Sequence, residues 1–320
     1  LQATIPASSG YTSAMLNVGS MQNMGYEVTL DLVPLQKQNF TWNMNFNIAL
    51  NRNKVTALTN DQYSLLRSVS WDQRFNAQYP YITQVGKPSG MMYGFIYEGT
   101  YKPDEFNGGT SLKDGIPYMT SVGQEKVKPG DPKYRDINAD GLIDDNDRTI
   151  IGCGQPLHTG GFGNTFNFYG FDLNIFFSWS YGNDVINANR LYFENGSITN
   201  TNQLKTYTNR WSEKNPTSDI PRVGADIASM FVYSSRVVED ASFLRLRNVT
   251  LGYTFPRKLL RKMHFDTMRL YVSGENLWTL TNYSGPDPEV STRNSVLTPG
   301  FDWSAYPRAM GVTAGLSFTF

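Results

Sequence analysis

The segment 136–147 has the residue types and the spacing of a twelve-residue calcium-binding loop. Its predicted oxygen ligands are the side chains of Asp136, Asn138, Asp140, Asp144 and Asp147 and the main-chain carbonyl of Leu142. Gly141 permits the sharp turn that such a loop makes at its sixth position. Because calcium prefers oxygen ligands, the sequence predicts a calcium-type loop within residues 129–152.

Two features of this segment leave another interpretation open. The twelfth position is Asp147, which is shorter than the usual bidentate Glu, and no helix pattern follows the loop. An acidic, solvated turn held by hydrogen bonds from Asp and Asn side chains to the main chain explains the same residues. Calcium remains the expectation because weak sites of this type suit the millimolar calcium outside cells.

Other residues with catalytic potential are few and scattered. The two histidines, His158 and His264, are far apart in sequence and have no partners at metal-ligand spacing. An enzyme that uses a nucleophile needs a base within reach of it, and no such pair is evident. Cys153 is the single cysteine, so no internal disulfide forms. We therefore expect a protein that is not an enzyme.

Composition limits the class of protein further. Lys plus Arg and Asp plus Glu both number 28, so no net charge recruits nucleic acid. Charged residues make up only 18%, below the roughly 25% of soluble domains. No stretch reaches the ~18 apolar residues of a membrane-spanning helix, which excludes a helical membrane protein. A transmembrane β-barrel remains possible because its strands alternate apolar and polar residues.

Alternating strands of transmembrane length recur along the chain. Between Phe40 and Leu50 every second residue is apolar, and the intervening positions are mostly Asn and Thr. Such a strand has one apolar and one polar face, and transmembrane strands need about 9–11 residues. We predict seven strands, at 23–36, 40–52, 161–169, 171–182, 242–255, 268–278 and about 312–320. In the strand at 242–255 the alternation holds only from Val249, which predicts a bulge or a start above the bilayer.

The connections between these strands differ in length. Short turns are expected at 37–39, 169–170 and 256–265, and long connections at about 55–157, 185–239 and 279–306. Short turns on one side and long extracellular loops on the other are typical of outer-membrane barrels, whereas a soluble β-sandwich has mostly short connections. A single extra wall strand would break the up-and-down order, so the strand-like segment 90–101 either belongs to an extracellular hairpin or pairs with a strand that the sequence does not identify.

Seven strands do not close a barrel. An open sheet leaves unpaired backbone groups in lipid, so we expect an arc with two free edges that is a fragment of a larger barrel. The last strand ends on Phe320, similar to the terminal aromatic of bacterial outer-membrane proteins. That ending places residues 1–320 at the C-terminal part of one barrel domain.

Several long motifs resemble the SusC-like (RagA-like) family of TonB-dependent transporters. They occur in the family's order and cover essentially the whole chain: GYEVTLDL from Gly25, PGDPKYRDINADGLIDDNDRTIIG from Pro129, GGFGNTFNFYGFDLNIFFSWSYGND from Gly160, EDASFLRLRNVTLGYTFP from Glu239, MRLYVSGENLWTLTNYSGPDPE from Met268 and the closing GVTAGLSFTF. The stretch around Cys153 and His158 departs from the family's usual residues.

The resemblance implies an all-β, antiparallel transmembrane barrel, with about 22 strands in the whole protein. It implies import of an oligomeric nutrient, a glycan or a peptide, across the bacterial outer membrane. The implied partners are a SusD-like surface lipoprotein lid, TonB, outer-membrane lipid, and an N-terminal remainder that carries a plug. A passive porin or a surface receptor or adhesin barrel is the alternative, because its walls would look the same.

Aromatic residues are concentrated in the long connections and near strand ends. Packing within the loops is the favoured role for one set, ahead of sugar stacking or contact with a lid: Trp71, Tyr93, Phe95, Tyr97, Tyr101, Trp303 and Tyr306. Trp179, Tyr181 and Trp278 suit an aromatic girdle at the membrane boundary. The density of aromatic residues favours an interface between a lipoprotein and loops 55–128 and 185–239.

Overall fold

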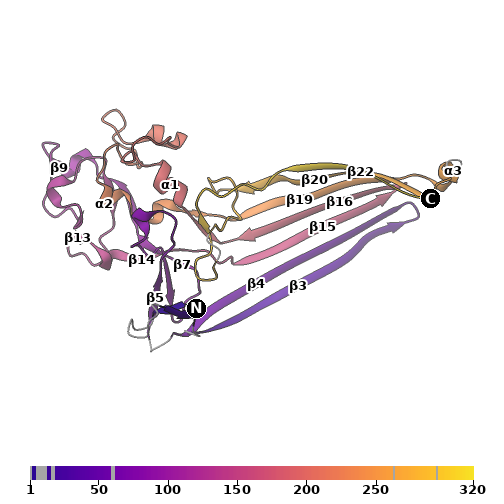
Figure 1. Ribbon diagram of the computed structural model, residues 1–320, viewed down its shortest axis with the longest axis horizontal. Coiled ribbons are helices and arrows are strands. Elements are labelled where there is room, and N and C mark those ends of the chain that lie inside the picture. Colours follow the sequence, from indigo (N-terminus) through magenta and orange to yellow (C-terminus); the bar gives the residue numbers. More distant parts are fainter. Residues whose placement is uncertain (1, 5–12, 16–18, 59–61, 262–263, 293–294) are drawn as a thin grey trace.

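The computed structural model describes residues 2–4, 13–15, 19–58, 62–261, 264–292 and 295–320. It consists of a long sheet and a compact body of loops at one end of that sheet (Figure 1). Within these ranges, none of the helices is long and apolar enough to cross a membrane.

Seven antiparallel strands form the long sheet, in the order β22-β20-β19-β16-β15-β4-β3. They are β3 (Gly19–Lys37), β4 (Phe40–Leu58), β15 (His158–Phe168), β16 (Phe171–Tyr181), β19 (Phe243–Thr254), β20 (Thr267–Thr281) and β22 (Gly311–Thr319). The seven predicted strands are confirmed, and among the described residues the outer sides of β3 and β22 are unpaired. The predicted open arc is thus also confirmed. β4 continues six residues past the predicted end at 52 because its pairing with β3 continues to Gly19 opposite Leu58.

The register gives the sheet one apolar and one polar face. Phe46, Phe162 and Phe177 lie opposite one another on β4, β15 and β16, and residues that are directly opposite share a face. The row of Asn45 and Gly163 lies on the other face. Successive residues point to opposite sides, so the alternation read in the sequence becomes an apolar outer wall and a polar inner wall.

A buried amide lies among the apolar side chains of the outer face. Asn164 of β15 is only 9% exposed, and its Oδ1 accepts a hydrogen bond of 3.0 Å from Nε1 of Trp42. The indole ring covers the amide and also stacks on Phe166. A satisfied amide of this kind avoids the cost of an unpaired polar group in an apolar environment.

Short turns join the strands at one end of the sheet. Tyr169 and Gly170 connect β15 to β16, and both have positive φ angles (46° and 87°), as a two-residue type I′ hairpin turn requires. The helix α3 (Arg257–Leu260) lies in the connection between β19 and β20. The long connections 59–157, 182–242 and 282–310 all leave from the opposite end, which confirms the predicted division (Figure 1).

The long connections fold into a body built from small sheets. A four-stranded sheet contains β5 (Ser64–Arg67), β6 (Tyr81–Gln84), β7 (Met91–Phe95) and β14 (Arg148–Cys153), and a three-stranded sheet contains β17 (Asp184–Asn187), β18 (Val238–Asp240) and β21 (Phe301–Asp302). Three two-stranded sheets of this body pair β8 (Tyr97–Thr100) with β12 (Pro132–Tyr134), β9 (Phe106–Asn107) with β10 (Ser111–Leu112), and β11 (Tyr118–Met119) with β13 (Leu142–Ile143). A separate two-stranded sheet before β3 pairs β1 (Gln2–Thr4) with β2 (Ser13–Met15). The segment 90–101 supplies β7 and β8 to this body, where β7 pairs with β14 and β8 pairs with β12.

The helices of the loop body are short. They are α1 (Ala188–Phe193), α2 (Ile227–Met230) and the 3-10 turns η3 (Gln73–Phe75), η4 (Pro103–Glu105), η5 (Gln124–Lys126), η6 (Asp145–Asp147), η7 (Lys205–Asn209) and η8 (Ser235–Val237). Buried apolar clusters form around Phe75, Met92 and Phe301 and around Phe95 and Ile143. The connections therefore form a packed body with its own core.

Candidate functional site: the inner wall and the loop body

The inner face of the wall carries a charged pair that spans three strands. Nε of Arg269 on β20 donates to Oδ1 of Asp172 on β16 at 3.0 Å, and a second guanidinium nitrogen reaches Oδ2. The strand between them, β19, places Gly252 at the crossing point. A Cβ atom at Gly252 would lie 2.5 Å from both Arg269 Nη2 and Asp172 Oδ1. The glycine is therefore required for the ion pair to cross the middle strand.

A bulge in β19 places two arginines on the inner face. The register of β19 shifts between Leu246 and Asn248 against both neighbours, so Arg247 is the extra residue. The predicted bulge is confirmed. Because the extra residue restores the alternation, Arg245 and Arg247 both reach inner-wall groups: Nε of Arg245 donates to Thr279 and Nε of Arg247 donates to Ser178.

These arginines hold the connection 282–310 against the wall. Arg245 is buried and contacts Asp287 at 2.6 Å and Glu289 at 2.9 Å. Arg247 lies 2.9 Å from Glu289, and the half-exposed Arg308 lies 3.5 Å from each carboxylate. We call these five residues the loop clamp. A buried, charge-assisted set of this kind fixes the connection on the inner side of the sheet.

The clamp borders a cavity between the wall and the fixed connection. Its volume is about 380 Å³, within the range of small-ligand sites. Hydroxyl and amide groups of Thr159, Ser178, Ser180, Asn183 and Ser291 contribute to its lining, together with Arg247 and Glu289. The cavity offers hydrogen-bond donors and acceptors to a polar molecule at the mouth of the barrel.

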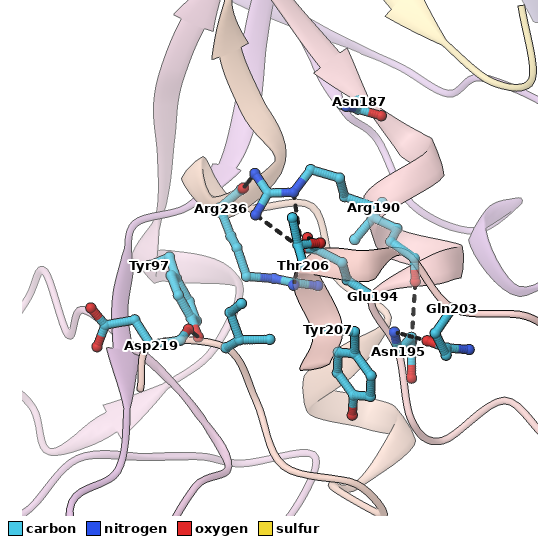
Figure 2. A network of polar contacts seen from close by, with 12 residues as sticks. Tyr97, Asn187, Arg190, Glu194, Asn195, Gln203, Thr206, Tyr207, Asp219 and Arg236 are labelled. Carbon is cyan, nitrogen blue, oxygen red and sulfur yellow. Dashed lines mark hydrogen bonds and ion pairs between the residues drawn. The ribbon is translucent and has the colours of Figure 1, made fainter. Parts of the chain in front are cut away.

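A second polar network lies inside the loop body (Figure 2). Glu194, at the end of α1, is 1% exposed and accepts a 2.9 Å hydrogen bond from Nε of Arg190. Nη1 of Arg236 lies 3.4 Å from the same carboxylate oxygen, and the hydroxyl of Thr206 donates to the other oxygen. Two guanidinium groups and a hydroxyl thus compensate the buried carboxylate.

The same network joins different connections of the chain. Arg190 also reaches Glu239 at 3.3 Å, and Glu239 accepts hydrogen bonds from the main chain and the hydroxyl of Ser284. Ser284 belongs to the connection 282–310, whereas Arg190 and Glu239 belong to 182–242. Burial raises the pKa of nearby Tyr97, whose neutral hydroxyl donates to the carbonyl of Asp219. The network therefore sets the positions of the outer loops relative to one another.

The predicted calcium loop lies between β12 and the start of β14. The carboxylate of Asp136 accepts main-chain hydrogen bonds from Ala139 at 2.7 Å and Gly141 at 2.8 Å. Asp147 accepts from Ile137 and Asp144, and Asp140 accepts from Leu142. No group of three or more His, Cys, Asp or Glu side chains in the described ranges is arranged to hold a metal ion. The loop thus shows the hydrogen bonds of the turn interpretation, and calcium binding stays a prediction.

Most of the aromatic residues predicted to pack within the loops have buried or stacked rings. Phe95 and Tyr101 are buried, and Trp71 and Trp303 pack with ring centroids 4.5 Å apart. Tyr306, in contrast, is 93% exposed. The favoured role of loop packing thus fits most of that aromatic set.

Neither histidine lies in a metal cluster of the described chain. Nδ1 of His158 accepts a hydrogen bond from the Trp179 indole at 3.1 Å, and His264 is exposed. Burial raises the pKa of the Cys153 thiol, which keeps it protonated.

Sequence reasoning did not identify the clamp acids or the network around Glu194. The sequence gives a partial indication of Asp287 and Glu289, because these acids follow β20. That strand pairs with β19, which carries Arg245 and Arg247. Arg190, Glu194 and Arg236 have no such signal because they are spread over a long irregular connection.

Comparison with known proteins gives consistent relatives over the whole chain. TonB-dependent receptor P3 of Formosa agariphila is 33% identical over 99% of this chain, and TonB-dependent receptor P26 of the same organism is 31% identical over 100%. TonB-dependent receptor SusC of Bacteroides thetaiotaomicron is 27% identical over 99%. The chain spans 30%, 31% and 28% of the lengths of these relatives. No family model matches.

Solved structures agree with this result. The RagAB peptide transporter matches with a TM-score of 0.77 and 24% identity, covering 99% of this chain and 31% of that one. The open-open state of the RagAB peptide importer matches with a TM-score of 0.73 and 25% identity over 100% of this chain and 31% of that one.

The seven-stranded wall with its two unlike faces defines an outer-membrane β-barrel protein. The chain is SusC- and RagA-like and corresponds to part of a TonB-dependent receptor. The names of these relatives are those of receptors and transporters, not of enzymes.

Proposed function

We propose that this chain forms part of the wall and the outer loops of a TonB-dependent importer of oligomeric nutrients, glycans or peptides. The observation that carries the proposal is the loop clamp. It fixes a long connection against the polar inner face, beside a cavity of about 380 Å³ lined with hydrogen-bonding groups. An inner wall of this kind suits a polar cargo that is bound before it passes.

The unpaired edges of β3 and β22 imply further strands of the same polypeptide. Unpaired backbone groups in lipid are too costly to persist, so the wall continues on both sides. We propose that these strands, with a plug and a TonB-contacting segment, belong to the remainder of the protein. The relatives support this arrangement because the chain accounts for only about 30% of their lengths.

A SusD-like lipoprotein is the proposed lid over the loop body. Several large apolar side chains of the first two long connections are exposed, including Tyr63, Leu66, Tyr79, Leu204, Val223 and Ile227. Exposed apolar groups on a packed body favour contact with another protein. The calcium-type loop at 129–152 is proposed to stabilise the same body when calcium is bound.

Growth on an oligomeric nutrient tests the importer against a passive porin. The full-length transporter is supplied to a strain that lacks its own copy, with TonB present or deleted. An importer supports growth only with TonB, whereas growth that persists without TonB supports a porin. The variant Arg245→Met serves as a second arm, because release of the clamp is expected to impair growth even with TonB present.

A further inference from the structure

A groove crosses the apolar face of the wall near the long-loop end. Its volume is about 490 Å³, and Trp179, Tyr181, Leu244 and Leu280 contribute its apolar lining. The groove lies on β16, β19 and β20, so strands that continue the sheet at either edge lie beside it and do not cover it. Because the outer face of a barrel contacts lipid, the groove is open to the membrane.

Aromatic rings place the groove at the level of lipid headgroups. His158 stacks on Tyr181 with ring centroids 5.0 Å apart, and the Trp179 indole donates to His158. Trp and Tyr are enriched at this depth because their rings are apolar and their tips are polar. The upper lining of the groove includes Asp240 and Asn282, whereas Leu280 is 59% exposed. The groove thus combines an apolar trough with a polar upper end.

Two cations lie on the same outer face beside this groove. Arg52 and Lys54 follow Ile48 and Leu50 at every second position of β4, so all four point outward. Nη1 of Arg52 donates to the carbonyl of Leu157 at 2.6 Å, directly before His158. Neither Arg52 nor Lys54 forms an ion pair with any side chain in the described part of the chain. Outward cations above an apolar band are complementary to a phosphate.

We propose that this surface binds a phosphate-bearing lipid of the leaflet at the long-loop end. One acyl chain lies in the groove against Tyr181 and Leu244, and the phosphate contacts Arg52 and Lys54. Tyr181 on β16 is two strands from β4, about 10 Å away, and Leu244 on β19 is about 5 Å farther. A lipid headgroup with its glycerol or sugar spans that distance. This inference requires the membrane location of the wall but not the import function.

Native mass spectrometry of the full-length transporter in neutral detergent tests the proposal, with dioleoyl phosphatidylglycerol as the probe. The double variant Arg52→Gln/Lys54→Gln is expected to retain roughly tenfold less phospholipid than the parent. The matched control is Lys258→Gln, an exposed lysine of α3 at the opposite end of the sheet. Heat-modifiable migration in gels verifies that each variant barrel is assembled.

Two further arms distinguish a bound phospholipid from a free phosphate ion and from a lipid held by its acyl chains alone. Leu280→Asn is expected to lower phospholipid retention several-fold with both cations present, because it makes the trough polar. Dioleoylglycerol, which has no phosphate, is expected to be retained poorly by all forms. Equal retention of both lipids, or no effect of the cation variants, overturns the proposal. Displacement of the phospholipid by millimolar inorganic phosphate would show a free-phosphate site instead.

Discussion

Gly252 is the position on the inner wall where the absence of a Cβ leaves room for the ion pair of Arg269 and Asp172. Replacing Gly252 with Ala is expected to push apart Arg269 and Asp172, because the new carbon meets both side chains at 2.5 Å. The expected cost is on the order of 1 kcal/mol, since a partly exposed ion pair and its packing are disturbed. The measurement is the temperature at which the full-length barrel loses its folded gel migration. Gly311→Ala is the control, because nothing lies within 4 Å of its added carbon.

Glu194 is the buried acid on which the loop network depends. Changing Glu194 to Gln leaves Arg190 and Arg236 without their shared charge, and breaking a buried pair in this way costs about 3–5 kcal/mol. We expect the loop body to open locally, with faster hydrogen exchange in α1 and η8, while the strands of the wall stay protected. Glu213→Gln, at an exposed position, should leave exchange unchanged. Equal protection of the loop body in both variants would contradict the assigned role.

The calcium-type loop is expected to bind calcium weakly through its acidic side chains. Titration of the full-length protein with calcium should give binding in the weak, roughly 10⁻⁴–10⁻³ M range, and Asp136→Asn/Asp140→Asn should abolish it. The exposed Asp114→Asn provides a control for loss of surface charge. If the parent binds no calcium by calorimetry, the hydrogen-bonded turn alone accounts for this sequence.

The loop clamp acts at the scale of elements, because it joins β19 to the connection 282–310. Burial acts to raise the pKa of Asp287, but hydrogen bonds and the charges of Arg245 and Arg308 outweigh burial, and the net pKa is lowered. A lowered folded-state pKa stabilises the clamp above the unfolded value of about 3.9, and this stabilisation is lost as pH falls through the folded value. The clamp therefore holds at neutral and mildly acidic pH.

Hydrogen exchange measured against pH checks this behaviour. After correction for the intrinsic rate, protection of the connection 282–310 should stay constant from about pH 7 to 5 and fall only below about pH 4. In Arg245→Met the protection should already be low at pH 7, because a buried carboxylate loses its nearest cation. Loss of protection near pH 6 in the parent would show that a titrating group other than Asp287 controls the stability of the clamp.

At the scale of the whole molecule, the wall and the loop body have different roles. The wall provides the membrane boundary, and we propose that the loop body contacts a partner. We expect loops 55–128 and 185–239 to bury more than about 1,000 Å² against a SusD-like lipoprotein, the size of a specific interface. Purification of the full transporter from its native membrane should yield the lipoprotein in near-equal amount.

A matched variant sharpens this test of the lid. Val223→Asp/Ile227→Asp introduces charges at two exposed apolar positions of the loop body and is expected to lower co-purification strongly. Val312→Asp is not a suitable control because that residue lies on the membrane wall. The exposed Val296→Asp lies in the connection 282–310, outside both loop segments and off the membrane wall, so it serves instead. Unchanged co-purification in all variants would show that the lipoprotein does not bind through these loops.

The seven-stranded wall could be predicted from local sequence patterns. Strand residues alternate with a period of two, and only one register keeps Phe46, Phe162 and Phe177 on a common face. The number of strands, their order, the short turns and the bulge near Arg247 all follow from that local pattern. The hairpin turn at Tyr169–Gly170 is also determined locally, because it depends on the backbone conformation of these two residues and not on distant contacts.

The fold of the long connections depends on contacts between residues that are far apart in the sequence. Glu194 meets Arg236 across 42 residues, and Arg245 meets Asp287 across another 42. Irregular segments have no period that fixes which side chains converge, so these pairs depend on the packing of the whole loop body. The strands of the wall follow a local alternation of residues, so the wall can be predicted from the sequence. The loop body is held by contacts between distant residues, so its fold cannot be predicted in this way.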